Sequence, residues 1–238
     1  MSTPHQHSTR QAASTDAIAP VLRSKTAARQ AYNRMSRWYD WMAGASERKY
    51  RQAGLTVLQP HPGESILEIG CGTGHSLEEI AAAVGENGLV CGLDLAENMI
   101  RISRERLKAK ELSGQTLLLQ GDGAALPFQS GQFDAVFLSF TLELFAAPEL
   151  VQVLAACHTV LKPDGRLILV TMTSSTTPSW TMQAYLRLRR FFPQVLDCRP
   201  IPVETLLQNA SFIVVSQQTF SMFGFPVIVI NAEKESPA

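Results

Sequence analysis

The chain has 238 residues, of which 45% are hydrophobic and 18% charged, so it is long enough to bury the core of one sizeable domain. Lys and Arg number 21 and Asp and Glu also number 21, a balance that does not favour a nucleic-acid or other polyanion partner. The four cysteines lie far apart without a CxxC pair, and the longest apolar run, 223–230, is interrupted by Pro226, so a zinc site, a disulfide framework and a membrane-spanning helix are not expected.

The first predicted feature is an N-terminal tail. Residues 1–24 are rich in Ser, Thr, Gln and Ala and have no hydrophobic periodicity, which predicts disorder, although a targeting segment would have a similar composition. Residues 25–238 are expected to form a single domain, beginning with a helical cap at 25–58. Within that cap, 25–42 places aromatic residues on one side of a helix, where they would pack on the core or face a ligand.

Strands and helices then alternate along the chain. Apolar runs predict strands at 65–70, 89–95, 116–120, 133–140 and 165–172, with helices at 76–84, 97–110 and 148–161. Ser76, followed by Glu79, predicts a capping box at the start of the first of these helices. The runs 211–220 and 226–233 leave no room for a helix between them, which predicts an antiparallel hairpin. The expected fold is α/β, a doubly wound, mostly parallel, seven-stranded Rossmann-like sheet that ends in this hairpin.

A glycine-rich turn follows the first predicted strand, in the segment ILEIGCGTGHS. Gly70, Gly72 and Gly74 lie where such a sheet binds its ligand, beyond the carboxyl end of a strand. A dinucleotide-binding motif would have a third glycine at the position of His75, and a phosphate-binding loop would need a lysine next to Gly74; both are absent. A nicotinamide-dependent oxidoreductase is therefore a weaker interpretation than a protein that binds a nucleoside without a pyrophosphate.

Three carboxylates accompany the turn. Glu68 lies in the first strand, Asp94 ends the second and Asp122 follows the third. A carboxylate at the end of the second strand can accept the ribose hydroxyls of a nucleoside, and the group of three would attract a positively charged ligand. The sequence therefore predicts a cationic nucleoside as ligand, and it contains no pattern that indicates a metal site.

With these motifs in this order, residues 32–234 resemble the class I S-adenosylmethionine-dependent methyltransferases. The motifs are ILEIGCGTG, Asp94 in GLDLAENMI, Asp122 in GDGAALPF, the strand FDAVFLSF and VLKPDGRLILV. The N-terminal YxxxxxxYD element at 32–40 is similar to that of the ubiquinone- and menaquinone-biosynthesis type. The resemblance implies a methyltransferase that uses S-adenosyl-L-methionine as its cofactor.

The resemblance also implies how individual residues hold the cofactor. Glu68, Cys71 and the three glycines would lie along its methionine and ribose portion, and Asp94 would bind the ribose. Asp122, Gly123 and Ala124 would face the adenine, and Leu95 and Met99 would pack on its ring. Ser139 would border the methionine end, and Tyr39 would approach the cofactor from the N-terminal helix.

Candidate catalytic groups are Tyr39, Glu143 and His75. A methyl acceptor that must lose a proton needs a base, whereas a neutral amine needs none. Glu143 follows the fourth strand among apolar residues that would raise its pKa, but it could equally be an exposed carboxylate at the start of a helix. His75 could instead form a local hydrogen bond, and Tyr39 could belong to the core.

The acceptor is expected to be selected by the helical cap and by an insertion at 174–202. That insertion combines apolar residues with Arg187, Arg189 and Arg190, which could cover a lipid-like acceptor or contact a membrane peripherally, or could form a lid with a solvated basic face. The predicted acceptor is a quinone precursor or a phospholipid headgroup. The insertion differs from the longer, tyrosine-rich insertion of the quinone-methylating enzymes, which argues against a quinone, whereas its arginines and apolar surface are compatible with a phospholipid headgroup. A small soluble amine, thiol or hydroxyl compound and a non-catalytic binding module remain alternatives, and the expected location is cytoplasmic, with or without membrane association.

Overall fold

The computed structural model describes residue 18 and residues 24–42, 44–173 and 199–235, with the side chains of 34–46 outside that description. The predicted tail and most of the predicted insertion at 174–202 therefore lie outside the described residues. The helices and strands that position the site occur in this order: α1 Lys25–Met42, α2 Gly44–Leu58, β1 Ser65–Ile69, α3 His75–Val84, β2 Leu89–Asp94, α4 Glu97–Ala109, β3 Thr116–Gln120, β4 Phe133–Ser139, α5 Ala147–Val160, β5 Leu161–Met172, α7 Val203–Asn209, β6 Phe212–Met222 and β7 Phe225–Lys234.

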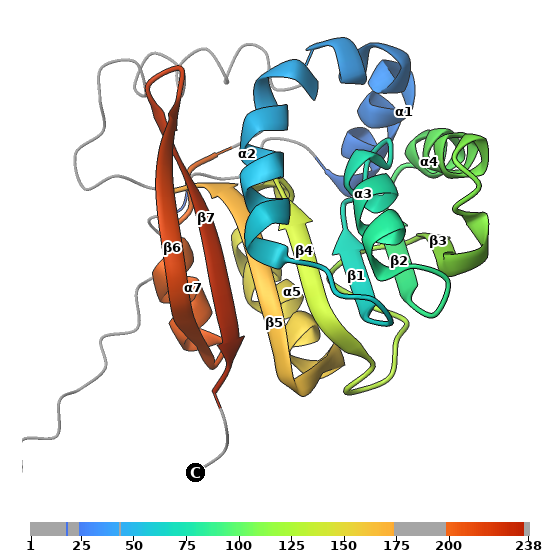
Figure 1. The fold of residues 1–238 in the computed structure, drawn as a ribbon. Coiled ribbons are helices and arrows are strands. Elements are labelled where there is room, and N and C mark those ends of the chain that lie inside the picture. Colours follow the sequence, from blue (N-terminus) through green and yellow to red (C-terminus); the bar gives the residue numbers. More distant parts are fainter. Residues whose placement is uncertain (1–17, 19–23, 43, 174–198, 236–238) are drawn as a thin grey trace, which may run out of the picture.

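One seven-stranded sheet runs through the molecule in the order β3-β2-β1-β4-β5-β7-β6 (Figure 1). Neighbours among the first five strands are parallel, and β7 pairs antiparallel with both β5 and β6. The predicted fold and the C-terminal hairpin are confirmed. The order reverses at β1 and β4, so the carboxyl ends of these two strands border the crevice in which doubly wound sheets bind ligands.

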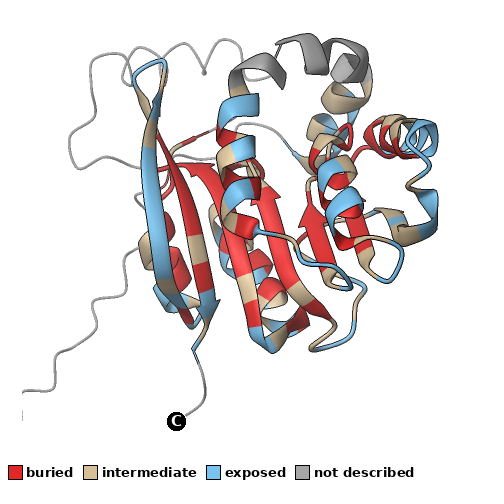
Figure 2. Cartoon of the chain, viewed as in Figure 1, coloured by how far each residue is buried: buried red, intermediate tan, exposed pale blue. Residues whose placement is uncertain are grey.

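Helices cover both faces of the sheet. Ile66 of β1 packs in a cluster with residues of α2, α3 and α4, whereas Leu67 packs in a second cluster with residues of α5 and α7. The central strands are buried on both sides (Figure 2). Continuous apolar runs such as FDAVFLS are explained by this double coverage, because a strand with one solvated face would alternate apolar and polar residues.

The start of α3 differs from the prediction. The helix begins at His75, its N-cap is Gly74 with φ of 82°, and there is no side-chain capping bond, so the predicted capping box at Ser76 and Glu79 is wrong. Ser76 lies inside the first turn, where it is buried and hydrogen-bonded to the Glu68 carboxylate. Because the helix begins at His75, before Ser76, the Ser76 hydroxyl does not cap the helix and bonds Glu68 of β1 instead.

No helix in the described part of the chain combines sufficient length with sufficient apolar character to span a bilayer.

Candidate functional site

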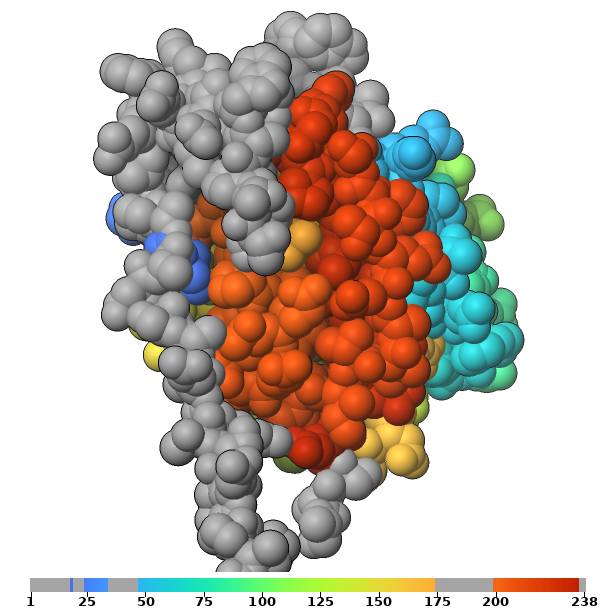
Figure 3. Space-filling view, turned by 90° about the vertical axis from the view of Figure 1, so that its left-hand side faces the viewer, coloured from blue at the N-terminus to red at the C-terminus, as the bar shows by residue number. Residues whose placement is uncertain are grey.

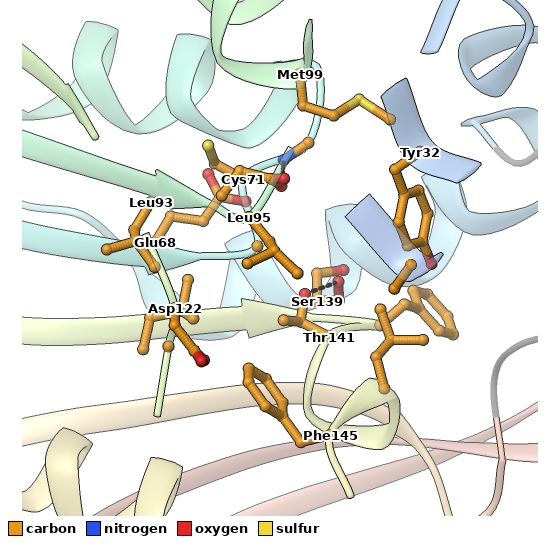
Figure 4. Close-up of a pocket in the computed structure, with 18 of the residues that line it drawn as sticks. Tyr32, Glu68, Cys71, Leu93, Leu95, Met99, Asp122, Ser139, Thr141 and Phe145 are labelled. Carbon is orange, nitrogen blue, oxygen red and sulfur yellow. Dashed lines mark hydrogen bonds between the residues drawn. The ribbon is translucent and has the colours of Figure 1, made fainter. Parts of the chain in front are cut away.

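A cavity of about 390 Å³ opens at the carboxyl ends of β1, β2 and β4 (Figure 4). Side chains from α1 and α2 cover it, among them Tyr32 and Arg51. Small-molecule pockets have volumes of about 300 to 1,000 Å³. The cavity therefore has the size of a small-molecule site and lies at the switch point of the sheet.

The glycine turn forms the floor of this cavity. Gly70 has φ of 74°, and a Cβ atom there would lie 2.3 Å from Thr141 Oγ1, so only glycine fits. Gly72 has φ of 53° and would direct a Cβ atom into open space. Backbone is therefore exposed to the cavity at Gly72, where a ligand can approach it closely.

Glu68 reaches the cavity from β1 although it is only 2% exposed. Burial raises its pKa to about 8, against the opposing effects of the Ser76 hydrogen bond and the charge of Arg51. Its Oε2 atom has no hydrogen-bond partner among the described residues. A ligand that donates a hydrogen bond or carries a positive charge would satisfy this atom.

Asp94 connects the glycine turn to the start of α4. Its two carboxylate oxygens accept the backbone N–H groups of Gly72 at 2.9 Å and Ala96 at 2.8 Å. Burial raises its pKa, and the two backbone bonds oppose that rise. Each oxygen has a second lone pair, so the carboxylate can hold the turn and still accept a bond from a ligand in the cavity.

Asp122 lies at the other end of the cavity, beside the start of α1. The Lys25 ammonium group bonds Asp122 and is 2.6 Å from Glu149 Oε1 of α5. Asp122 also accepts the backbone N–H of Ala124 at 3.0 Å. The first residue of α1 is thus attached to the sheet at the cavity rim.

The structure brings most of the predicted site residues together around this cavity. Those that line it are Glu68, Gly70, Cys71, Gly72, His75, Asp94, Leu95, Met99, Asp122, Gly123 and Ser139. Gly74 caps α3, and Ala124 packs against the core cluster beneath α5. The side chain of Tyr39, on α1, lies outside the description. His75 Nε2 lies 3.1 Å from an Arg106 guanidinium nitrogen, so it also has a local partner.

Glu143 lies in a buried polar cluster below the cavity. Its side chain is 0% exposed, and its carboxylate accepts the Thr171 hydroxyl at 2.8 Å and the Met172 N–H at 3.3 Å. Burial raises its pKa to about 7. The buried Arg199 donates to the Glu143 carbonyl at 3.2 Å and to that of Phe145. These bonds fix the segment that follows β4, and the catalytic role of Glu143 stays a prediction.

Several cavity residues were not predicted from the sequence. Glu47 and Arg51 both line the cavity from α2, and Tyr32, Phe140 and Phe145 provide aromatic walls. Glu47 and Arg51 are four residues apart and so share a helix face, a signal present in the sequence once α2 is recognised. Burial and the charge of Glu143 raise the pKa of Glu47 to about 7, with Arg51 acting in the opposite direction.

The residues present fit S-adenosyl-L-methionine. Arg51 Nε and Glu68 Oε2 are buried atoms without hydrogen-bond partners among the described residues, one a donor and the other an acceptor. The amino-acid end of the cofactor carries both an ammonium and a carboxylate group, which complement these two atoms. Among the side chains that the structure describes, no cluster of three or more His, Cys, Asp or Glu could hold a metal.

Comparison with known proteins gives a consistent result for the central part of the chain. Residues 66–165 match the family model described as a methyltransferase domain. The chain is 33% identical over 141 residues to the demethylmenaquinone methyltransferase of Listeria welshimeri, covering 58% of each protein. It is 32% identical over 166 residues to that of Lactococcus lactis, covering 68% of this chain and 65% of the relative. The chain thus spans less than two thirds of either relative.

A solved methyltransferase structure has a fold similar to that of this chain over most of its length. It is the 1,6-didemethyltoxoflavin-N1-methyltransferase of Burkholderia thailandensis in complex with 1,6-didemethyltoxoflavin and S-adenosylhomocysteine. The two chains superpose with a TM-score of 0.66 at 20% sequence identity, over 91% of this chain and 94% of that one. Residues 66–165 thus carry a methyltransferase domain, and the chain is similar to curated methyltransferases of the menaquinone-biosynthesis type and shares its fold with a solved S-adenosylmethionine-dependent methyltransferase.

Proposed function

We propose that the protein transfers a methyl group from S-adenosyl-L-methionine to an apolar acceptor that carries a weakly acidic hydroxyl group, as a reduced quinone precursor does. The observation that carries this proposal is the composition of one cavity, which combines the glycine turn and Asp94 with an aromatic wall. Two relatives named demethylmenaquinone methyltransferase support an acceptor of this class.

The cofactor would be held by the residues nearest the turn. Gly70 and Gly72 allow its close approach, Asp94 would accept the ribose hydroxyls, and Glu68 with Arg51 would bind the amino-acid end. Bound S-adenosyl-L-methionine supplies a methyl group that its positively charged sulfur has already activated. Positioning of the acceptor can therefore provide much of the rate.

The acceptor would lie against the α1 and α2 side of the cavity. Tyr32 of α1 and Phe140, whose ring packs against Tyr50 of α2, line it there and suit a planar apolar ring. Phe140 has φ of 50°, and such strain at a bulky residue is typical of functional sites. The acceptor ring would pack on these side chains with its hydroxyl group toward α2.

Glu47 is proposed as the base that accepts the hydroxyl proton of the acceptor. It lines the cavity, and its raised pKa of about 7 lets it bind and release a proton near neutral pH. Because the deprotonated carboxylate is the active form, the rate should rise as the pH increases through about 7.

The test is transfer of labelled methyl groups from S-adenosyl-L-methionine to demethylmenaquinol, to phosphatidylethanolamine and to a small soluble amine, each supplied separately. Label in the quinol supports the proposal. Label only in the phospholipid or the soluble amine would assign another acceptor, and cofactor binding without turnover on any of them would indicate a non-catalytic module.

Two variants test the role of Glu47. Glu47→Gln should lower the rate by about 10²-fold or more and remove its rise with pH. Glu79→Gln is the matched control, because Glu79 lies on α3 with its carboxylate bonded to Gln52 at 3.0 Å. A Glu47→Gln enzyme with an unchanged pH profile would exclude Glu47 as the base.

A further inference from the structure

The turn between β6 and β7 holds an aromatic residue in a strained position. Its two central residues, Phe223 and Gly224, have φ of 53° and 84°. Positive φ at both positions is the geometry of a two-residue hairpin turn that favours Asn-Gly, and a bulky residue there is strained. Phe223 is nevertheless 78% exposed, so no packing within the described residues offsets this strain.

Two exposed cations lie next to this hairpin. Arg48 and Lys49 of α2 line a shallow groove together with Phe220 of β6. Tyr50 attaches α2 to the hairpin, because its hydroxyl donates to the Ser221 carbonyl at 2.7 Å and its ring packs edge-on against Phe220 at 5.8 Å. Figure 3 shows the hairpin as one continuous face with α2 beside it. The exposed phenyl ring and the two cations are therefore held on neighbouring, connected elements.

The same surface adjoins the cavity. The turn lies at the carboxyl ends of the parallel strands, since Met172 at the end of β5 pairs with Val227 near the start of β7 (Figure 1). Tyr50 also packs edge-on against Phe140, a cavity-lining residue, at 6.3 Å. One aromatic side chain thus separates the hairpin from the cavity wall.

We propose that this surface, formed by Phe223, Arg48 and Lys49, docks on an anionic phospholipid membrane. Phe223 would insert at the boundary between headgroups and acyl chains, and the two cations would contact the acidic headgroups. Of the neighbouring carboxylates, Glu47 faces the cavity, and Glu79 on α3 keeps its charge because its partner Gln52 is neutral, so the two cations outnumber the one carboxylate at this surface. The proposal does not depend on the identity of the acceptor, because docking is measured without turnover.

The experiment is co-sedimentation of the full chain with vesicles of phosphatidylcholine, with and without phosphatidylglycerol. Binding is expected only when phosphatidylglycerol is present, and it should weaken as salt is added. Phe223→Asn should lower the affinity by about tenfold, and Lys49→Glu by at least about fivefold. Because Asn-Gly suits the turn, Phe223→Asn should keep or raise the melting temperature, so weaker docking cannot be attributed to misfolding.

Ile213→Thr provides the matched control. Ile213 is 53% exposed on the same strand, β6, but pairs with Glu233 at the end opposite the turn. This variant should dock as the wild type does. Absence of vesicle binding, equal binding to neutral vesicles, or equal losses in Phe223→Asn and Ile213→Thr would overturn the proposal. Self-association that Phe223→Asn abolishes would instead assign the surface to a second copy of the chain.

Discussion

Glu68 is a residue whose ionisation is strongly altered by the fold. Its pKa rises to about 8 because it is buried, and one carboxylate oxygen has no partner among the described residues. The folded protein therefore holds a proton on Glu68 that the unfolded chain releases near its ordinary pKa of about 4.3. The stabilisation that Glu68 contributes is fully present below that lower pKa and is lost as the pH rises through about 8.

The pH dependence of unfolding tests this account of Glu68. Glu68→Gln should reduce the loss of stability between about pH 5 and pH 8, where one proton contributes up to ~1.4 kcal/mol per pH unit. Denaturant titrations of wild type and variant across this range provide the measurement. Parallel stability curves for the two proteins would contradict the raised pKa of Glu68.

Asp94 holds the glycine turn and is proposed to bind the cofactor. Its carboxylate accepts the backbone N–H groups of Gly72 in the turn and of Ala96 at the start of α4, so Asp94→Asn should both loosen the turn and weaken S-adenosyl-L-methionine binding by about tenfold or more. Asp134→Asn is the control, since Asp134 is bonded to Ser65 and Lys162, away from the cavity. Isothermal titration calorimetry measures both affinities. Equal affinities for Asp94→Asn and Asp134→Asn would remove Asp94 from the cofactor site.

At the scale of elements, Lys25 fastens the start of α1 to the rim of the cavity. Its ammonium group pairs with Asp122 and Glu149, with side chains between 26% and 38% exposed. Partly exposed ion pairs contribute little to global stability, about 0 to 1 kcal/mol. Lys25→Met should therefore lower the melting temperature only slightly but increase hydrogen exchange in α1. A large loss of melting temperature with unchanged exchange in α1 would contradict this local role.

Some helices and strands could be located from the sequence, and others could not. The strands β1, β2, β4 and β5 were predicted because continuous apolar runs are typical of strands buried on both faces, and β3 was predicted from its apolar run although it lies at the sheet edge and is partly exposed. The short α7 was not predicted, and the start of α3 was misplaced by one residue because the φ of Gly74 is a backbone property that the Ser76 pattern does not encode. Predictions for the tail and for 174–202 concern residues outside the described part.

At the scale of the molecule, the two halves of the site were not equally predictable. The cofactor half consists of local motifs at strand ends, so Gly70, Gly72 and Asp94 could be located from the sequence. The proposed acceptor half depends on where α1 and α2 pack, and this packing brings Tyr32 and Glu47 to the cavity. Such packing joins segments far apart in the chain, which periodicity alone does not reveal.

The central claim is that this cavity binds the methyl donor at the glycine turn. The most direct test is calorimetric titration of S-adenosylhomocysteine into wild type, Gly72→Ala and Gly63→Ala. Both glycines have positive φ and open space for a Cβ atom, so both variants should lose about 1 kcal/mol of stability. Only Gly72→Ala should lose affinity for S-adenosylhomocysteine, by about tenfold or more, because its methyl group would block the close approach of the ligand to the backbone. Absence of binding to the wild type, or equal affinity in all three proteins, would contradict the account.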